Sequence, residues 1–202
     1  MEEDFMNKRQ LQKQKTREHI LKIAKQEFVE KGFLNTTTNQ IALQAGIAHG
    51  TLFLHFKNKD NLIVEILDKE LELMSSGIQD LVGRSADLEQ MLILYLNLLE
   101  EDEKLFSVLA RELPFYPEEL RRKIMFRDSL IRSHFHNVIE SGIGAGKYRK
   151  LDPSTAVTFL FGTINYYLSL RSIFVENGSV IAKFRSKIIS TFKALLICEK
   201  EK

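Results

Sequence analysis

The residues whose types and spacing could do chemistry lie between Thr36 and Lys59, in the run TTTNQIALQAGIAHGTLFLHFKNK. Thr37 and Gln40 fit a capping box, in which a hydroxyl and a side-chain amide satisfy free backbone amides at a helix start. Gly46 stands where that helix would end, because glycine adopts the left-handed conformation without steric penalty. A second helix is expected from about His49 to Phe56. Two short helices around a tight turn are typical of a helix-turn-helix, whose second helix enters the DNA major groove.

The second of these helices divides into an inward and an outward side. Leu52 and Phe56 are four residues apart, so both can pack inward on one face. An exposed Phe53 and Leu54 would be unfavourable in water unless a partner covers them. Apolar side chains can contact thymine methyl groups, while Thr and His can bond base edges or phosphates. The residues expected to face outward or sideways are His49, Gly50, Thr51, Phe53, Leu54 and His55.

The segment before the motif predicts a supporting helix over residues 16–32. Ile20, Ala24 and Phe28 recur every four residues, and Gly32 is the expected C-terminal cap. Residues 7–15 are basic and poor in large apolar side chains. They are either a frayed terminus or an arm that lies along the minor groove or the phosphates.

With these residues in place, the chain resembles the TetR family of bacterial transcriptional repressors. The resemblance covers about the first third of the chain and rests on an ordered set of residues: Thr16-Arg17, Ile20, Ala24, Phe28, Gly32, Thr36-Thr37, Ile41-Ala42, Ala45-Gly46, Gly50-Thr51-Leu52-Phe53, His55-Phe56, Lys59 and Leu62. It implies DNA contacts from the start of the second helix, the outward side of the third and the lysine that opens the fourth: Thr37, Thr38, Asn39, His49, Gly50, Thr51, Phe53, Leu54, His55 and Lys59.

One departure from the family pattern changes the expected contacts. The family usually has Tyr where this chain has Phe53, so a phenol that would bond a phosphate is missing. Phe53 is then expected to make an apolar contact with a base or a sugar. Because Leu54 also offers no hydrogen bond, we expect less readout through base hydrogen bonds than in relatives with polar residues there.

Charge is distributed unevenly along the chain. The net charge of the whole sequence is +2. Residues 5–59 hold ten Lys or Arg against three Asp or Glu, a balance of +7, whereas residues 60–202 hold 19 against 21, a balance of −2. A basic end on a mildly acidic remainder is typical of a DNA-binding head on a body that need not touch DNA.

The remaining sequence predicts helices throughout, so the expected fold class is all-α. Only 3 prolines and 10 glycines interrupt the 202 residues. We expect a three-helix helix-turn-helix DNA-binding domain over residues 1–58 and a helical effector-binding and dimerisation domain over residues 59–202. The expected helices of the second domain cover residues 59–76, the stretch opened by 85–87, residues 105–113, a long helix from Pro117 to the glycine-rich run 142–146, and residues 153–174 and 180–197.

The last two helices carry more apolar surface than one core needs. Residues 153–174 are apolar nearly all round, and residues 180–197 repeat Ile and Phe at spacings of three and four. Pairing with the same helices of a second copy would cover this surface in a four-helix bundle about a two-fold axis. The resemblance implies the same homodimer, and a dimer suits a palindromic double-stranded operator.

The family usually holds a small effector among its middle helices, and this chain has aromatic and Met side chains that could line such a cavity. Side chains of this kind at helical spacing also fill ordinary cores. A largely apolar pocket would favour a lipophilic ligand such as an acyl chain or a hydrophobic drug. The candidates are Tyr95, Phe106, Met125, Phe126, Phe159 and Tyr166, with Arg111, His134 and Asn165 as further polar ones.

Other classes of function find little support in these residues. His134 and His136 diverge by about 200° on a helix, so no metal site is predicted, and neither is a cofactor. The sequence shows no nucleophile–base pair and no paired inward carboxylates, so it does not predict an enzyme. The single cysteine, Cys198, excludes an internal disulfide and is expected to pack against other helices. No signal peptide or membrane-spanning segment is predicted, which favours a cytoplasmic location.

The leading hypothesis is therefore a sequence-specific DNA-binding transcriptional regulator, a dimeric repressor released from its operator by a small lipophilic effector. The alternative is a TetR-like helical nucleoid or cell-division DNA-binding protein without such an effector.

Overall fold

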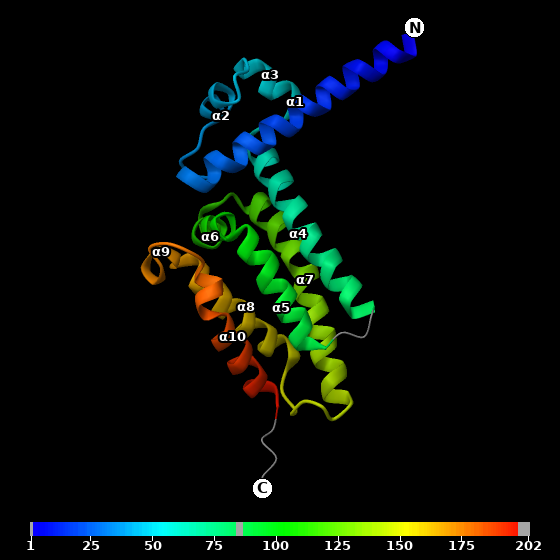
Figure 1. Ribbon diagram of the computed structural model, residues 1–202, viewed down its shortest axis with the longest axis vertical. Coiled ribbons are helices and arrows are strands. Elements are labelled where there is room, and N and C mark those ends of the chain that lie inside the picture. The colour runs from blue at the N-terminus through cyan, green and yellow to red at the C-terminus, as the bar shows by residue number, and fades with distance from the viewer. Residues whose placement is uncertain (1, 84–86, 198–202) are drawn as a thin grey trace. The chain divides into compact units, whose positions relative to one another are not determined.

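The computed structural model describes residues 2–83 and 87–197, with side chains from Lys8 onward, and within those ranges every regular element is helical (Figure 1). The chain divides into two compact units, residues 1–67 and 68–202. We call them the head and the body. The predicted helical fold class is confirmed. The predicted division at residue 58 falls at the start of a helix that runs through both units, so the assignment of separate functions to residues 1–58 and 59–202 stays a prediction.

The head is built from α1 (Glu2–Lys31), α2 (Thr38–Gln44), α3 (His49–His55) and the first part of α4 (Lys59–Gly83). Its core consists of side chains from all four helices that are fully shielded from water, with Phe28 and Phe33 in ring contact at 4.8 Å. These include the predicted inward residues: Ile20, Ala24, Phe28, Ile41, Leu52 and Leu62, all at 0% exposure. The 3.6-residue periodicity read from the sequence therefore identified the buried face of the head.

Two glycines end helices of the head where the sequence predicted caps. Gly32 and Gly46 have φ values of 86° and 65°, in the left-handed region that only glycine adopts readily. After Gly46 the backbone N–H of Ile47 donates to the carbonyl of Ala42 at 3.0 Å, which closes the turn between α2 and α3.

The first helix is longer than the sequence predicted. It begins at Glu2 instead of near Thr16, so residues 7–15 are a helical extension and not an unstructured terminus. Hydrophobic periodicity could not identify this extension, because a helix that packs against nothing carries no apolar stripe.

In the part of the body that the structure describes, the rest of α4 is followed by seven further elements. These are α5 (Leu88–Glu101), α6 (Glu103–Glu112), the 3-10 turn η1 (Leu113–Phe115), α7 (Glu118–Gly144), α8 (Pro153–Ser169), α9 (Arg171–Phe174) and α10 (Val180–Leu196). α8 packs against α6, α7 and α10, and α10 also packs against α5 (Figure 1). An aromatic cluster of Tyr95, Phe135 and Phe161 joins α5, α7 and α8, with ring centroids 5.1–5.8 Å apart.

Several helix ends differ from those predicted. α4 continues to Gly83, well past the expected end at residue 76. The helix expected over residues 153–174 is broken at Leu170 into α8 and α9. The predicted opening of α5 is confirmed at Asp87, whose carboxylate accepts from the Gln90 backbone at 2.9 Å. Cys198, expected to pack, lies outside the described residues.

A buried carboxylate ties the beginning of α6 to the beginning of α10. Glu103 is only 5% exposed. Its oxygens accept hydrogen bonds from Arg171 Nε at 2.7 Å, Val180 N at 2.9 Å and Ile181 N at 3.0 Å, and also from the Ser179 hydroxyl. The carboxylate satisfies backbone amides of the first turn of α10, which have no partner inside that helix.

In the parts of the chain that the structure describes, no helix has the length and apolar content needed to cross a bilayer.

Candidate nucleic-acid interface and ligand cavity

The predicted capping box fixes the beginning of α2. The Thr37 backbone N–H donates to Gln40 Oε1 at 2.9 Å, and the Gln40 N–H donates to Thr37 Oγ1 at 3.3 Å. Thr37 and Asn39 are exposed and Thr38 is half-buried. These three residues therefore surround an anchored helix start, where side-chain hydroxyls and backbone amides can meet a phosphate.

α3 has the inward and outward sides that its sequence predicted. Leu52 and Phe56 are 0% and 2% exposed and hold the helix on the head core, whereas Leu54 is 78% and Phe53 44% exposed. Gly50 is also exposed, and His49, Thr51 and His55 are half-buried. α3 thus exposes two apolar side chains, Phe53 and Leu54, which we call its apolar tip. Their exposure to water is unfavourable, and contact with base edges would remove it.

His49 links the beginnings of α2 and α3. Its Nε2 lies 3.0 Å from Thr38 Oγ1, and its ring meets the Phe53 ring edge-on at 4.8 Å. The contact fixes the rotamers of three predicted DNA-contact residues before any partner binds. Such preorganisation reduces the conformational entropy lost on binding.

His55 faces partly into the head. Among the described residues, no hydrogen-bond partner lies near its Nδ1, which is buried. Burial, followed by the nearby charges of Lys13 and Arg17, lowers the pKa of His55 below its usual value of 6.5. The ring is therefore neutral at pH 7, so it would contact DNA by hydrogen bonding and not as a cation.

Lys59 has a structural partner that the sequence did not indicate. Its Nζ donates to the carbonyls of Phe33 (2.8 Å) and Thr36 (3.0 Å), in the loop between α1 and α2. An ammonium group has three donors, so one remains for a phosphate. Arg17 makes a comparable internal link, because it binds both oxygens of Glu65 and lies 4.4 Å above the Phe56 ring.

These contacts predict different outcomes for two neighbouring lysines. Lys59→Ala should lower the unfolding free energy by about 1–3 kcal/mol, because two loop carbonyls lose their partner, and it should weaken DNA binding. Lys57→Ala, at an exposed position, should leave stability unchanged and only flatten the salt dependence of DNA binding, by about 0.9 in log–log slope. Urea unfolding and salt-titrated fluorescence anisotropy measure the two effects. Equal stability of both variants would contradict the structural role of Lys59.

The body contains a cavity of about 270 Å³ among α4, α5, α6, α7 and α8. Three of the six predicted effector-binding residues, Tyr95, Phe106 and Met125, line it. The rest of the lining is mostly aliphatic: Leu71, Leu99, Leu109, Ala110, Leu113, Pro114, Ile124 and Leu168, with the polar Asp128, Arg132 and Asn165. Of these residues, the sequence indicated only Asn165. Among the further polar candidates Asn165 is present in this lining and Arg111 and His134 are not.

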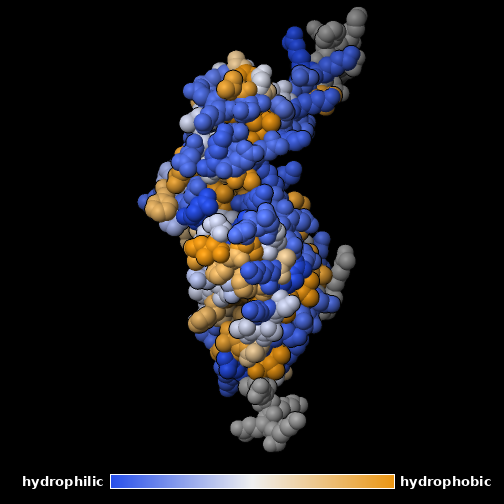
Figure 2. All heavy atoms as spheres, turned by 60° about the vertical axis from the view of Figure 1, so that its left-hand side comes forward, coloured by the Kyte–Doolittle hydropathy of each residue, from blue (hydrophilic) through white to orange (hydrophobic). Residues whose placement is uncertain are grey.

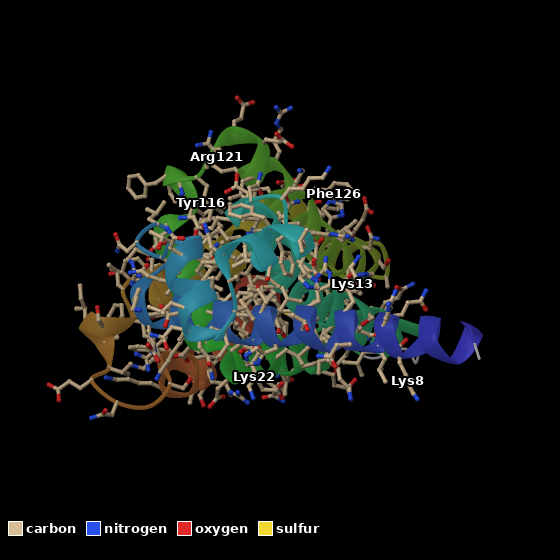
Figure 3. All side chains as sticks on the ribbon, turned by 90° about the horizontal axis from the view of Figure 1, so that it is seen from above. Lys8, Lys13, Lys22, Tyr116, Arg121 and Phe126 are labelled. Atoms are coloured by element: carbon tan, nitrogen blue, oxygen red, sulfur yellow. The ribbon has the colours of Figure 1, made fainter. Side chains whose placement is uncertain are left out.

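The structure does not bring the other three predicted effector-binding residues to this cavity. Phe126, Phe159 and Tyr166 are 62%, 63% and 54% exposed. Figure 3 shows Phe126 at the outer side of α7. Phe159 and Tyr166 lie on the outward side of α8, which is apolar nearly all round. Helical spacing alone cannot say which side of such a helix faces a cavity.

Polar groups are few in the cavity, and two of them pair with each other. The Arg132 guanidinium binds the carboxylate of Asp128 and lies 4.3 Å above the Phe161 ring. Burial raises the pKa of Tyr95 far above its usual value, so its phenol stays protonated and can donate a hydrogen bond. The cavity therefore offers a mostly apolar wall with a few polar groups, which suits a ligand with a long hydrocarbon part.

A second hollow lies on the outward side of α8 and α10. Its walls are Phe159, Thr163 and Tyr167 from α8 together with Lys187, Ile188, Thr191, Phe192 and Leu195 from α10. A shallower hollow follows α8 itself past Thr155, Thr158, Gly162 and Tyr166. Figure 2 shows hydrophobic patches interleaved with polar ones on the side of the body that carries these helices. Small residues beside exposed aromatic rings are suited to close packing against another helix.

Comparison with known proteins gives two adjoining family matches. Residues 20–66 match the family described as bacterial regulatory proteins, tetR family, and residues 84–169 match the tetracyclin repressor-like C-terminal domain. Both parts of the chain thus match the same kind of protein, and the first match includes α2 and α3 entirely.

Individual relatives match over most of their length. The fatty acid metabolism regulator protein of Bacillus subtilis is 28% identical over 154 residues, which cover 72% of this chain and 78% of that protein. The HTH-type transcriptional repressor KstR2 of Mycolicibacterium smegmatis is 25% identical over 157 residues, 73% of this chain and 75% of that one. The structure of the transcriptional regulator FadR from Bacillus subtilis in complex with stearoyl-CoA has a TM-score of 0.75 and 23% identity, and the match covers 88% of this chain and 97% of that one.

Proposed function

The chain belongs to the TetR family of bacterial transcriptional regulators, and on that premise we propose that it is a dimeric repressor that leaves its operator when a lipophilic effector enters the body. The observation that carries the proposal is the exposed apolar tip of α3, Phe53 and Leu54, on a helix anchored by Leu52 and Phe56. The proposed DNA contacts are Thr37, Thr38, Asn39, His49, Gly50, Thr51, Phe53, Leu54, His55 and Lys59.

Two copies of the chain would pair through the outward sides of α8 and α10. The exposed rings of Phe159 and Tyr166 would be covered there, in a four-helix bundle about a two-fold axis. A two-fold dimer presents two copies of α3, so the operator should be palindromic, with half-sites about 34–36 Å apart or at an adjusted spacing.

The effector would occupy the cavity lined by Tyr95, Phe106 and Met125. Two observations support an acyl compound. The cavity wall is mostly aliphatic, and the related FadR structure holds stearoyl-CoA. A fatty acid or a fatty acyl thioester is therefore the class to test first, with its chain against Leu99, Leu109 and Leu168.

Release from DNA requires that the effector bind one conformation of the dimer better than the other. A shift from almost fully bound to almost fully released takes about 10⁴-fold differential affinity, or ~5.5 kcal/mol. The proposal includes no catalytic activity, and it places the protein in the cytoplasm, where an operator is accessible.

The decisive experiment selects duplexes from a random oligonucleotide pool with the purified full-length chain at low ionic strength. We expect enrichment of one palindromic motif and release of that duplex by a long-chain acyl thioester. Recovery of unrelated duplexes with no release would favour a nucleoid-type DNA-binding protein. Absence of any duplex preference would refute the regulator function.

Filling the cavity should separate effector binding from DNA binding. Ala110→Phe places a ring in the cavity lining, so the concentration of acyl thioester needed for release should rise at least tenfold, while operator affinity without effector is retained. Anisotropy of labelled operator during effector titration measures both. Ala145→Phe, at an exposed position beyond α7, is the matched control. Ala110→Leu gives a milder version of the same change if the larger ring destabilises the body. If both Ala110 variants release the operator at the effector concentration that releases wild type, the effector binds elsewhere.

A further inference from the structure

The N-terminal half of α1 extends beyond the helices that α1 packs against. Ile20, Ala24 and Phe28 are fully buried, whereas every residue from Lys8 to Lys15 is exposed. Since α1 begins at Glu2, residues 2–15 make roughly 20 Å of helix before the half-buried Thr16, at 1.5 Å per residue. A helical segment of this length is marginally stable in water by itself. A partner that neutralised its charges would stabilise it.

A ten-residue stretch within the exposed part of α1 is strongly basic. Residues 8–17, KRQLQKQKTR, contain five Lys or Arg and no Asp or Glu. Arg17 is committed to Glu65 and to the ring of Phe56. The stretch therefore carries an excess of positive charge of its own, which makes it chemically complementary to a polyanion.

The cations of the extension occupy two different faces. Arg9 and Lys13 are spaced by four residues from each other and from Arg17, so they continue the face of α1 that is buried further along by Ile20. Lys15 and Lys22 lie on the opposite face. Figure 3 shows this arrangement, since Lys13 projects from one side of α1 and Lys8 and Lys22 project from the other.

The face with Arg9 and Lys13 adjoins the C-terminal end of α3. Arg17, on this face, stacks on Phe56, the residue that ends α3. Lys13 is close enough to α3 for its charge to lower the pKa of His55. The basic face thus adjoins the C-terminal end of α3, with His55 at the junction.

We propose that Arg9 and Lys13 clamp DNA phosphates beside the groove that α3 enters, and so extend the DNA-binding surface along α1. The inference rests on the proposed function, because it takes α3 to be the element that meets DNA. Two observations favour a nucleic-acid backbone as the occupant. The stretch 8–17 contains five cations and no acidic residue, and it adjoins the C-terminal end of α3 through the Arg17–Phe56 contact.

Phosphate contacts at these positions would carry no sequence information. They would raise the affinity for every duplex and fix the register of α3 in the groove. Their contribution would come from counterion release, which makes it measurable as a salt dependence. A surface that read bases would instead change the preference between duplexes.

The test compares the double variant Arg9→Ala/Lys13→Ala with wild type in a salt titration, using the full-length chain, the selected operator and a random duplex. Each lost phosphate contact flattens the log–log salt slope by about 0.9. We therefore expect a slope reduced by about 1.8 for each bound protomer, and an equal fold-loss of affinity on both duplexes. Circular dichroism should show an unchanged melting temperature, because both side chains are exposed.

The matched control is Lys15→Ala/Lys22→Ala, which removes the same charge from the opposite face of the same helix and should leave the slope at the wild-type value. An unchanged slope in the Arg9/Lys13 variant, or an equal change in the control, would overturn the clamp while wild type still prefers its operator. A wild-type chain that prefers no duplex would overturn the proposed function and the clamp with it.

Discussion

Replacing Glu103 with alanine should destabilise the body by about 3–5 kcal/mol. The carboxylate is buried and accepts from Arg171, Ser179 and the first backbone amides of α10. Alanine would leave the guanidinium and two amides without their acceptor, and breaking a buried charged pair costs an amount of this order. The melting temperature should fall by on the order of 10 °C. Urea and thermal unfolding followed by circular dichroism give both values.

The control for this variant is Glu101→Ala, an exposed acid two residues away, which should change stability by less than about 0.5 kcal/mol. An equal loss in both variants would show that Glu103 contributes only as one more acidic residue.

The same carboxylate should make the stability of the body sensitive to acid. Burial by itself raises the pKa of Glu103, but hydrogen bonds from Ser179, the Ile181 and Val180 amides and Arg171 outweigh it, so the pKa lies below its usual value of 4.5. A lowered folded-state pKa means that the stabilisation is complete above about 4.5 and is lost as the pH falls through the folded value. Glu103→Gln carries no charge at any pH. Its stability deficit relative to wild type should therefore shrink below pH 4.5.

Leu54→Asp should abolish specific DNA binding without affecting folding. Leu54 is 78% exposed, so the substitution should change the unfolding free energy by less than about 0.5 kcal/mol. A carboxylate on the outward side of α3 would face the negative charge of the duplex, and like-charge contacts in an interface cost several kcal/mol. Operator affinity should fall at least ~100-fold, equivalent to ~2.7 kcal/mol.

Leu73→Asp provides the comparison, because Leu73 is an exposed leucine of α4 in the body, at 55% exposure. It introduces the same charge and should bind the operator as wild type does. Leu54→Ala should have a smaller effect that depends on thymine content in the operator. Retained affinity in Leu54→Asp would show that α3 does not lie against DNA.

The helix-turn-helix of the head could be predicted from sequence because its determinants are local. The capping box of Thr37 and Gln40, the turn at Gly46 and the spacing of Leu52 and Phe56 all act within a few residues of each other. Each is encoded by residue type and spacing alone. The bounds of α2 and α3 therefore followed from the chemistry of helix ends.

The details that the sequence did not predict depend on contacts between distant residues. Glu103 is more than 65 residues from each of its donors, so its neighbourhood gave no sign that this acid is buried. Lys59 was predicted to contact phosphates. Its hydrogen bond to the carbonyl of Phe33 could not be predicted, because it depends on the path of the loop between α1 and α2. In the same way, Phe159 is an aromatic residue of a kind that often lines cavities. Only the packing of α8 shows that its side chain faces outward.

Under the proposed function, burial of the exposed Phe53 and Leu54 against DNA would also make the affinity for the operator depend on temperature. Removal of an apolar surface from water on binding gives a negative change in heat capacity. The favourable free energy of such burial therefore becomes smaller on cooling. The DNA affinity of a recognition helix with polar side chains at both positions would change much less with temperature. Occupancy of the operator should thus fall on cooling even without an effector, because two apolar side chains of α3 contribute to the binding.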